Sequence, residues 1–386
     1  MSDLPPAPAT VGLREVTKRY VGGARPAVDA LTLEIPAGEV CVLVGPSGCG
    51  KTTALKMINR LIEPTSGEIT IDGRDARTLA PAQLRRHIGY VIQQVGLLPH
   101  LTIAANVATV PRLLKWDRER IGARVAEMLD LVGLPAVEYG GRYPSELSGG
   151  QQQRIGLARA LAADPPLMLM DEPFSAVDPI TRDRLQNDFL DLQRTVSKTV
   201  VFVTHDIDEA VKMADRIAVM RDGRLVQFAT PAELLTNPAD AFVADFVGAD
   251  RALKRLSLMR VADLALTPAP TVIASDHVEV VHSRLRGGDL EPVDGYLLMT
   301  DTTGRPQGWV TVARLGSGGR VADTAAVAAQ PLLQPQTTVR DALSQMLDAG
   351  ARCAAVVDRD GTVAGVVEIA SIARIAHPDP MEAGTA

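Results

Sequence analysis

The sequence predicts an α/β protein with a mainly parallel, buried sheet, followed by a smaller α+β region. From Val11 to about Val247, short apolar runs alternate with longer helical patterns, as in proteins whose parallel strands are joined by helices. The run VCVLV at 40–44 leads directly into the glycine-rich stretch GPSGCGKTT at 45–53. Beyond Gly248 the pattern changes, and short similar segments recur.

Length and composition limit the possible classes of protein. A chain of 386 residues is long enough for two or three cores, since single domains run to about 100–200 residues. A net charge of −6 argues against broad nucleic-acid binding, which requires a basic face. Cys41, Cys49 and Cys353 have no C-x-x-C spacing, so neither a disulfide framework nor a zinc site is predicted, and the cytosol is the expected compartment.

The ends of the chain and its apolar runs give two further expectations. MSDLPPAPAT at 1–10 lacks the basic and apolar segments of a signal peptide and is expected to be a disordered tail. Residues 377–386 are expected to form a C-terminal tail. No apolar run approaches the roughly 18–20 residues that cross a bilayer. Any role at a membrane is therefore expected to depend on a partner.

The stretch at 45–53 has the spacing of a phosphate-binding loop, G-x-x-x-x-G-K-[ST]. Its glycines let successive backbone N–H groups face a polyphosphate, and a helix starting near Lys51 directs its positive end at the same anion. Lys51 would reach the β and γ phosphates, and the Thr52 hydroxyl would ligate Mg²⁺. A plain glycine turn is the alternative. The predicted ATP-binding residues of the loop are Gly45, Pro46, Ser47, Gly48, Cys49, Gly50, Lys51, Thr52 and Thr53.

Two acidic residues end a second apolar run. LMLM at 167–170 is typical of a central parallel strand buried on both faces, so Asp171 and Glu172 are expected at its carboxyl end, where open α/β sheets bind ligands. Asp171 is predicted to hold Mg²⁺, and Glu172 is predicted to polarise the attacking water. Acids that only solubilise the end of a strand are the alternative. Together with the phosphate loop, the pair indicates one nucleotide site.

Three further candidates follow from their positions. His205 ends the apolar stretch TVVFVT and would contact the γ-phosphate, although a lone histidine is as often structural. Gln93 follows the run GYVI and would join the metal or water shell. Tyr20 lies upstream of the loop and would stack on adenine, although aromatic residues in edge strands are nearly as common.

The pattern also divides the chain into regions. An ATPase domain is predicted over 11–247, with a mostly helical insertion at about 94–161. Within the insertion, IGARVAEMLDLVGL has the periodicity of an amphipathic helix that stops at Gly133. Residues 248–260 contain DRALKRLSLMR and are expected to be a basic connector.

The C-terminal region contains a weak internal repeat. GRPQGWVTVARL at 304–315 aligns with GTVAGVVEIASI at 361–372, and the segments VADLAL and VADTAA precede them at similar distances. Two copies of one small unit are the economical interpretation, with chance similarity of short Val/Ala/Gly strands as the alternative. The predicted copies are residues 261–315 and 316–376.

The stretches LSGGQQQR at 147–154 and SAVD at 175–178 set the class of ATPase. With them the sequence resembles the ATP-binding-cassette ATPases across 11–247, with every motif in family order. The resemblance implies an α/β phosphate-loop fold with a helical subdomain and an N-terminal antiparallel β-subdomain, working as a head-to-tail homodimer. The residues it implies in contact with the partner's γ-phosphate are Ser148, Gly149, Gly150 and Gln151, with Asp178 communicating between the two sites.

The flanking segments narrow the resemblance to one branch. LKMINRLIEPTSGEI, GYVIQQVGLLPHLTI and DEPFSAVDPITR look like the ATPase subunit of bacterial importers for glycine betaine, choline, carnitine or proline. This implies ATP and Mg²⁺ as ligands and a place at the cytoplasmic face of the bacterial membrane. It also implies two kinds of partner: integral membrane permease subunits that dock at Val95 to Leu101, and an extracytoplasmic solute-binding protein as an indirect partner. A soluble cassette ATPase acting on nucleic acid, or a ligand-sensing switch, is the alternative.

The C-terminal repeats are similar to tandem CBS modules, which often bind adenine nucleotides. The Thr-x-x-Asp that grips ribose and phosphate in many such modules reads Thr311 with Arg314, and Glu368 with Ser371, so simple AMP or ATP binding is not expected. Two regulatory mechanisms stay open: paired tails bind an adenine dinucleotide such as cyclic di-AMP, or the basic connector contacts anionic lipid. The first would use arginines among Arg305, Arg314, Arg352 and Arg359, and the second Arg251, Lys254, Arg255 and Arg260.

Overall fold

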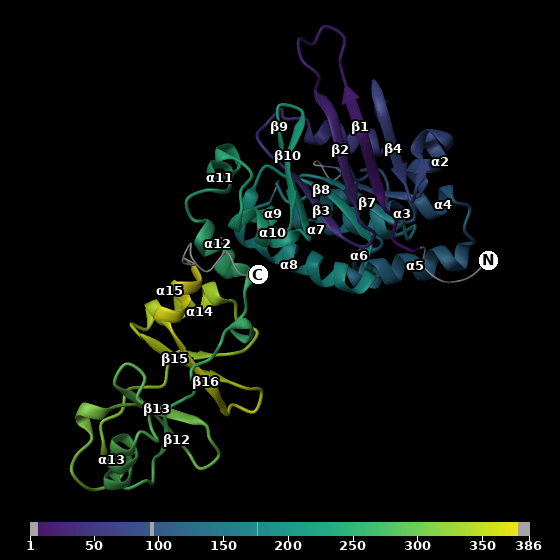
Figure 1. Cartoon of the computed structure of the whole chain (residues 1–386). Coiled ribbons are helices and arrows are strands. Elements are labelled where there is room, and N and C mark those ends of the chain that lie inside the picture. The colour runs from purple at the N-terminus through teal and green to yellow at the C-terminus, as the bar shows by residue number, and fades with distance from the viewer. Residues whose placement is uncertain (1–6, 93–95, 176, 377–386) are drawn as a thin grey trace. The chain divides into compact units, whose positions relative to one another are not determined.

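The computed structural model describes residues 7–92, 96–175 and 177–376 (Figure 1). The chain forms two compact units that divide between Val247 and Gly248. Ordered structure begins before the first strand, because Ala9 is buried and its N–H donates to the Pro166 carbonyl at 3.2 Å. The disordered tail expected over residues 1–10 therefore has too late an end, because Ala9 already belongs to the folded unit. The tail expected at 377–386 lies outside the described residues.

The first unit contains two sheets. An antiparallel sheet has the strand order β2-β1-β4-β5, and a six-stranded sheet has the order β10-β9-β3-β8-β7-β6, in which only the pairing of β10 with β9 is antiparallel. The strands are β1 (Val11–Lys18), β2 (Val28–Ile35), β3 (Val40–Val44), β4 (Ser66–Ile71), β5 (Arg74–Asp75), β6 (Ile88–Val91), β7 (Leu167–Asp171), β8 (Thr199–Val203), β9 (Arg216–Arg221) and β10 (Arg224–Ala229).

The three buried strands expected from apolar runs are confirmed as β3, β7 and β8. They lie next to one another in the sheet, and every residue in them is buried, as expected for parallel strands covered on both faces. The carboxyl ends of these strands therefore lie together at one edge of the sheet. That edge carries the phosphate loop after β3, Asp171 and Glu172 at the end of β7, and His205 after β8.

Helices connect and cover the strands of the first unit. Helix α1 begins at Lys51 as predicted, and the amphipathic pattern forms α5, which ends before Gly133. The helices are α1 (Lys51–Ile58), α2 (Pro81–Arg86), α3 (Ile103–Val107), α4 (Thr109–Leu113), α5 (Arg118–Leu131), α6 (Ala136–Tyr139), α7 (Gly149–Leu161), α8 (Pro179–Val196), α9 (Ile207–Met213), α10 (Pro231–Thr236) and α11 (Ala241–Val247). Among the described residues, no helix combines the length and apolarity needed to cross a membrane.

One buried cluster joins both sheets of the first unit to helix α1. It includes Leu13 of β1, Leu55 of α1 and Leu169 of β7. Apolar burial contributes about 25 cal/mol per Å², so the helix that starts at the phosphate loop is held from two sides. The loop is thereby attached to a rigid part of the fold.

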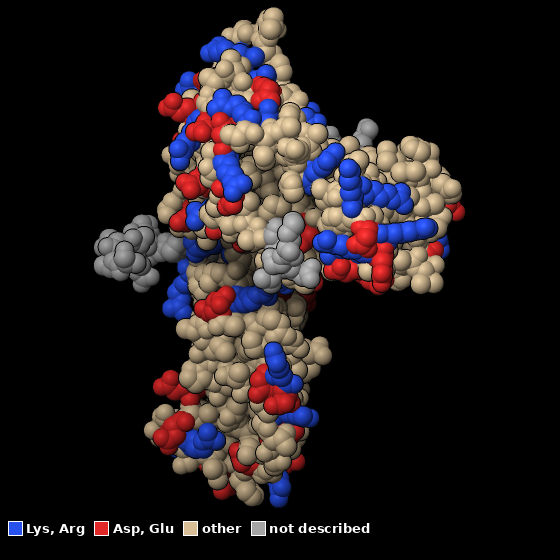
Figure 2. All heavy atoms as spheres, turned by 90° about the vertical axis from the view of Figure 1, so that its right-hand side faces the viewer, with Lys and Arg blue, Asp and Glu red and all other residues tan. Residues whose placement is uncertain are grey.

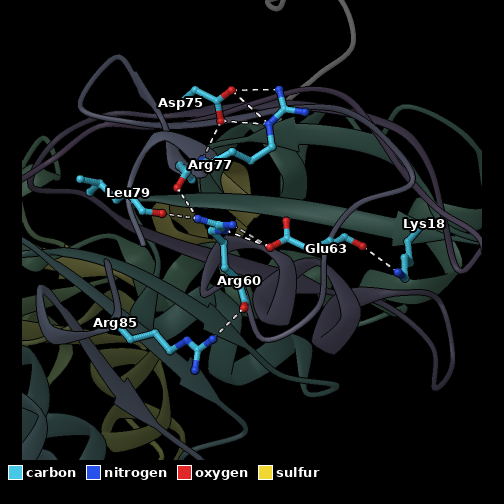
Figure 3. Close-up of polar contacts among 8 residues, drawn as sticks. Lys18, Arg60, Glu63, Asp75, Arg77, Leu79 and Arg85 are labelled. Atoms are coloured by element: carbon cyan, nitrogen blue, oxygen red, sulfur yellow. Dashed lines mark hydrogen bonds and ion pairs between the residues drawn. The ribbon is translucent and has the colours of Figure 1, made fainter. Parts of the chain in front are cut away.

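A polar network fixes the other end of α1 (Figure 3). The Arg60 guanidinium donates to the Leu79 carbonyl at 2.5 Å and to Glu63 Oε1 at 2.9 Å, while the Arg60 carbonyl accepts from Arg85 at 3.2 Å. The Glu63 carbonyl accepts from Lys18 Nζ of β1 at 2.6 Å. These contacts connect the end of the phosphate-loop helix to the antiparallel sheet and to α2.

Basic and acidic side chains are interspersed on the face that Figure 2 shows. The charges on this face are therefore not segregated into a single basic or acidic surface, in keeping with a net charge of only −6 in 386 residues.

The second unit consists of two copies of one motif, which confirms the predicted repeat. Each copy has a short strand, a helix and two further strands, in sheets of order β11-β12-β13 and β14-β15-β16, with the first pair parallel and the second antiparallel. The elements are α12 (Arg251–Leu258), β11 (Thr271–Ile273), α13 (Val278–Gly287), β12 (Tyr296–Thr300), β13 (Pro306–Thr311), β14 (Leu332–Leu333), α14 (Val339–Asp348), β15 (Cys353–Val357), β16 (Val363–Glu368) and α15 (Ile369–Ala376).

The two copies exchange the segments that precede their first strands. Thr267, upstream of β11, pairs with Val366 in β16 of the other copy, and Val327, upstream of β14, pairs with Trp309 in β13. Each pair makes two backbone hydrogen bonds, at 2.7–3.0 Å. The boundary expected between 315 and 316 thus separates the strands of the two copies but not their hydrophobic cores. Val261 belongs to the first predicted copy, yet it packs in the core of the second.

The expected basic connector is not a free linker. Helix α12 packs on α14 and α15, with Leu256 fully buried in the core of the second copy. Lys254 is also buried, and its Nζ lies 3.0 Å from Asp250 Oδ1. Arg260 donates to the Gln336 carbonyl at 2.6 Å. The apolar residues between the basic ones turn this segment into part of the second unit.

The turn between β15 and β16 gives the stability of the second unit an expected pH dependence. Asp358 accepts hydrogen bonds from the hydroxyl and backbone N–H of Thr362 and from the N–H of Asp360, and the Thr362 bonds hold the pKa of this carboxyl below its usual value. A depressed pKa in the folded state stabilises the fold above the ordinary aspartate pKa, and this contribution disappears as the pH falls through the depressed value. We expect Asp358→Asn to be less stable than the wild type at pH 7 and equally stable at low pH.

The chain's two tryptophans allow this difference to be measured. In a Trp116→Phe background, Trp309 in β13 is the only tryptophan left, so its fluorescence during urea unfolding reports on the second unit. Asp360→Asn is the matched control, because Asp360 enters the turn through its backbone N–H. A stability difference that persists at low pH would show that the charge of Asp358 is not its cause.

Candidate active site

The phosphate-binding loop requires glycine at two positions of close approach. Gly45 has φ 151° and Gly50 has φ 104°. A Cβ at Gly45 would lie 2.1 Å from the Met220 carbonyl oxygen, and one at Gly50 would lie 2.3 Å from that of Ala27. Both contacts are with backbone atoms, which cannot move aside cheaply. The loop is therefore held against β9 and against the start of β2.

The Lys51 side chain lies inside the curve of the loop. It is 6% exposed, and its Nζ donates to the Gly45 carbonyl at 2.6 Å and to the Pro46 carbonyl at 3.1 Å. Cys49 Sγ lies 3.7 Å from the same nitrogen, and burial raises the pKa of this thiol against the opposing effect of Lys51. The outer residues of the loop, Pro46 to Gly48, are exposed. A cation is thus enclosed by a loop whose outer backbone is open to solvent.

The two predicted metal ligands lie side by side. The Thr52 hydroxyl donates to Asp171 Oδ1 at 3.0 Å, although the residues are 119 positions apart in the chain. Asp171 is 9% exposed, and burial raises its pKa while the Thr52 bond lowers it. A hydroxyl and a carboxylate oxygen are hard ligands of the kind Mg²⁺ takes together with phosphate oxygens and waters. The residues present therefore fit Mg²⁺.

Glu172 and His205 form the second pair at the same sheet edge. Nδ1 of His205 lies 3.1 Å from Glu172 Oε1. Glu172 has φ 45°, a left-handed conformation, and its N–H donates to the Val203 carbonyl of β8 at 2.9 Å. Backbone strain of this kind persists where surrounding contacts impose it. The turn after β7 thus directs Asp171 toward the loop and Glu172 toward His205.

The remaining candidates for the same nucleotide site are placed as follows. Tyr20 lies in the connection from β1 to β2 and is 48% exposed, with Lys18 Nζ 5.3 Å from its ring centre. Ala27 links this connection to the loop, because its N–H donates to the Lys18 carbonyl and its own carbonyl abuts Gly50. The predicted position of Gln93 lies outside the described residues.

The residues that the resemblance assigns to the partner's nucleotide lie at two exposed helix starts. Ser148 precedes α7 and forms a capping box with Gln151, in which the Ser148 N–H donates to Gln151 Oε1 at 2.9 Å. Ser148 and Gly149 are exposed. Asp178 caps α8 by accepting from the Thr181 N–H at 3.0 Å, and this bond is the main cause of its lowered pKa. Both helix starts direct positive dipole ends and N–H groups at solvent.

The structure adds three polar residues that sequence analysis did not identify. Thr204, which directly precedes His205, is buried together with Gln186 and Glu209. The only sequence signal is Glu209 itself, a charged residue on the buried side of α9 beside Ala210 and Val211. A carboxylate rarely occupies such a position unless other groups bind it.

In the second unit, the residues at the expected nucleotide-contact positions differ from one another. In the second copy, Glu368 stands at the nucleotide-contact position, and its Oε1 accepts from the Thr267 hydroxyl at 2.9 Å. In the first copy, the exposed Arg314 stands at such a position. Arg305 lies beside Gly361, and its Nε would be 3.7 Å from a Cβ atom added to that glycine. Arg352 forms an ion pair with Asp294 at 3.4 Å. A nucleotide phosphate would meet a carboxylate near Glu368.

Comparisons with known proteins agree with this geometry. A model of the family described as ABC transporter matches residues 28–175, and one described as CBS domain matches residues 330–377. The osmoprotectant import ATP-binding protein OsmV of Salmonella typhimurium is 46% identical over 362 residues, which cover 92% of this chain and 94% of that protein. The glycine betaine/carnitine/choline transport ATP-binding protein OpuCA of Bacillus subtilis is 45% identical over 368 residues, 95% of this chain and 96% of that protein.

A solved structure extends the comparison to the first unit. A dimeric, post-hydrolysis structure of the ATP-binding cassette MJ0796, bound to ADP and Pi, is 38% identical in sequence with a TM-score of 0.51. It covers 57% of this chain and 98% of that chain. The likeness therefore concerns the nucleotide-binding unit, whereas the two importer subunits are similar over both units.

Proposed function

Because the chain belongs to the ABC transporter family, as one of its osmoprotectant-import ATP-binding subunits, we propose that it hydrolyses ATP to drive uptake of a quaternary amine such as glycine betaine, choline or carnitine, or of proline. One observation carries this proposal: similarity to OsmV and OpuCA runs through more than nine tenths of this chain and of theirs. It therefore includes the CBS modules as well as the ATPase unit. OsmV is named as an osmoprotectant import protein, and OpuCA as a glycine betaine/carnitine/choline transport protein.

The described residues at the sheet edge have separate roles in hydrolysis. Lys51 neutralises phosphate charge, and Thr52 with Asp171 would hold the Mg²⁺ that adds to this neutralisation. Glu172 orients and polarises the attacking water. A carboxylate only accepts hydrogen bonds, so its contact with His205 assigns a proton to Nδ1 of that ring and fixes the ring for contact with the γ-phosphate. Gln93 is proposed to complete the metal and water shell, and Tyr20 to stack on adenine.

Two subunits are proposed to close head to tail over two ATP molecules. Each site then needs the loop of one chain and the helix start at Ser148 to Gln151 of the other, and the exposure of Ser148, Gly149 and Asp178 leaves them accessible to a second copy. Closure would move the attached permease subunits, and hydrolysis would reset them. Asp178 is proposed to communicate between the sites.

Permease subunits are proposed to dock at Val95 to Leu101, of which Val95 lies outside the described residues. Buried Asn106 fixes the described part: its side chain accepts from the Leu98 N–H at 2.8 Å and donates to the Leu101 carbonyl at 3.1 Å. A hollow of about 320 Å³ borders this segment, lined by Leu98, Thr109 and Val110 among others. A rigid loop beside a hollow suits a helix from a membrane subunit. The chain would then lie at the cytoplasmic face of the bacterial membrane, with the solute-binding protein as an indirect partner.

Reconstitution tests the proposed function. The chain is expected to co-purify with an integral membrane permease and, in proteoliposomes loaded with Mg-ATP, to drive uptake of radiolabelled glycine betaine, choline, carnitine or proline. Lys51→Ala in the same complex is the control for ATP dependence. Hydrolysis without any permease association, or uptake of none of these solutes, would contradict the proposal.

The CBS modules are proposed to regulate the importer and to take no part in its chemistry. Two mechanisms stay open, an adenine dinucleotide such as cyclic di-AMP between paired modules, or contact with anionic lipid. Burial of Lys254 leaves Arg251, Arg255 and Arg260 as the accessible cations of the connector, with Arg251 and Arg260 exposed. The lipid mechanism thereby loses one of its four cations, which favours the dinucleotide, and this ligand would meet Arg305 and Arg359 on neighbouring turns.

Truncation after Gly248 tests this regulation. The cut falls between the two compact units, so the ATPase unit is expected to keep ATP-driven transport and to lose its response to salt and to cyclic di-AMP. Transport is measured in proteoliposomes across a salt series, since salt screens charge contacts over about 8–10 Å near physiological ionic strength. Arg305→Glu should affect only the dinucleotide response, and Arg251→Glu only the salt response. A truncated importer with full regulation would place the sensor elsewhere.

A further inference from the structure

A buried carboxylate contacts the residue that directly precedes His205. Glu209, on α9, is 7% exposed. Its Oε1 accepts from Gln186 Nε2 of α8 at 3.0 Å, and Thr204 donates to it through its side chain. Burial raises the pKa of Glu209, while the bonds from Thr204 and Gln186 oppose this rise. Burial of a charge-bearing group costs free energy, so a carboxylate at this position needs an explanation beyond packing.

The Thr204 hydroxyl is oriented by one hydrogen bond that it accepts and one that it donates. Its Oγ1 accepts from the Asp206 N–H at 3.1 Å, so its single proton is free to go to Glu209. Its backbone N–H donates to the Leu43 carbonyl of β3 at 3.2 Å. Thr204 is 2% exposed and directly precedes His205. Glu209 therefore holds the side chain of the residue that directly precedes His205.

The other partner of Glu209 lies on the helix that begins at Asp178. Gln186 is 5% exposed and follows the start of α8 by two turns. At that start, the Arg182 guanidinium donates to the Val177 carbonyl at 3.1 Å and also lowers the pKa of Glu209 through its charge. A continuous path of contacts thus runs from the Asp178 turn through α8 and Glu209 to Thr204, His205 and Glu172.

We propose that Glu209 is a positioning residue, which holds His205 toward Glu172 and links it to the helix that begins at Asp178. Movement of α8 on closure of the dimer is then transmitted to His205 through Gln186 and Glu209. This inference rests on the proposed ATPase function. It concerns a residue that contacts neither nucleotide nor metal.

A second contact between α8 and α9 provides the matched control. Lys212 Nζ lies 2.6 Å from Asp183 Oδ1 at the surface of the same two helices. If Glu209 only fastened α9 to α8, loss of this ion pair would have a similar effect. If Glu209 acts through Thr204 and His205, Asp183→Asn leaves turnover unchanged.

The test compares ATP hydrolysis by full-length variants, with ATP affinity and melting temperature measured in parallel. Glu209→Ala is expected to lower kcat about 10- to 100-fold, as loss of a supporting hydrogen-bond partner commonly does, while KM and ATP affinity stay unchanged. Glu209→Gln should recover part of the loss, since its carbonyl can accept from Gln186 or Thr204. Thr204→Val should resemble Glu209→Ala, and Thr204→Ser should restore most of the turnover.

The double variant with His205→Ala separates positioning from simple stabilisation. If Glu209 acts through His205, adding Glu209→Ala to His205→Ala costs little further turnover. Full additivity, or an unchanged kcat in Glu209→Ala, would overturn the inference. Should Glu209→Ala fail to fold, the Thr204→Val and Thr204→Ser pair decides in the same way. A wild-type chain without Mg-ATP hydrolysis would instead contradict the proposed function.

Discussion

Glu172→Gln is expected to lower steady-state ATP hydrolysis about 100-fold or more while leaving ATP binding intact. Glutamine has nearly the same shape and can still hydrogen-bond a water, but it cannot accept a proton or supply negative charge. His205 loses its charged partner at 3.1 Å, and the Asp171 and Thr52 pair stays unchanged. The closed dimer should then persist with ATP bound, which size-exclusion chromatography in Mg-ATP can detect.

The control for this change is Glu127→Gln on α5. Glu127 is also paired with a basic residue, Arg124 at 2.8 Å, but it lies in the helical part of the unit rather than at the sheet edge. Its turnover should match that of the wild type. If Glu172→Gln hydrolyses ATP at the normal rate, Glu172 does not take part in the hydrolysis step.

Ser148→Arg is expected to abolish dimer closure while each subunit still binds ATP. The side chain would place a bulky cation on the exposed start of α7, where the partner's γ-phosphate is proposed to lie. Lys51→Ala is expected to fail for a different reason, because it removes the cation that the loop encloses. Each variant alone should have very little hydrolysis.

Mixing the two variants distinguishes a shared site from a site within one chain. Random pairing gives roughly half heterodimers, in which one composite site carries both changes and the other carries neither. Partial recovery of nucleotide-driven closure is therefore expected. Ser148→Ala is the control for the lost helix cap, which is worth about 1 kcal/mol by itself. If the mixture stays inactive and Ser148→Ala is equally impaired, Ser148 only caps α7.

Much of the nucleotide site follows from local sequence. The loop spacing, the apolar strands β3, β7 and β8, and the acids after LMLM each depend on a few consecutive residues, so their positions in the sheet could be predicted. The repeat in the second unit was visible for the same reason. Assignments to the partner subunit rest on the resemblance and stay predictions, as does the role of Gln93.

The sequence by itself therefore determined which functional groups follow the buried strands and in what order along the chain. These groups are a phosphate loop, two acids and a histidine, each at the end of a buried apolar run. Only the tertiary structure decided which side chains meet, because Thr52 and Asp171, or Gln186 and Glu209, are brought together by sheet pairing and helix packing between distant segments. It also decided the burial of Lys254 and the exchanged segments at Thr267 and Val327. Local patterns set which face of an element is apolar, whereas the partner of each face depends on contacts far apart in sequence.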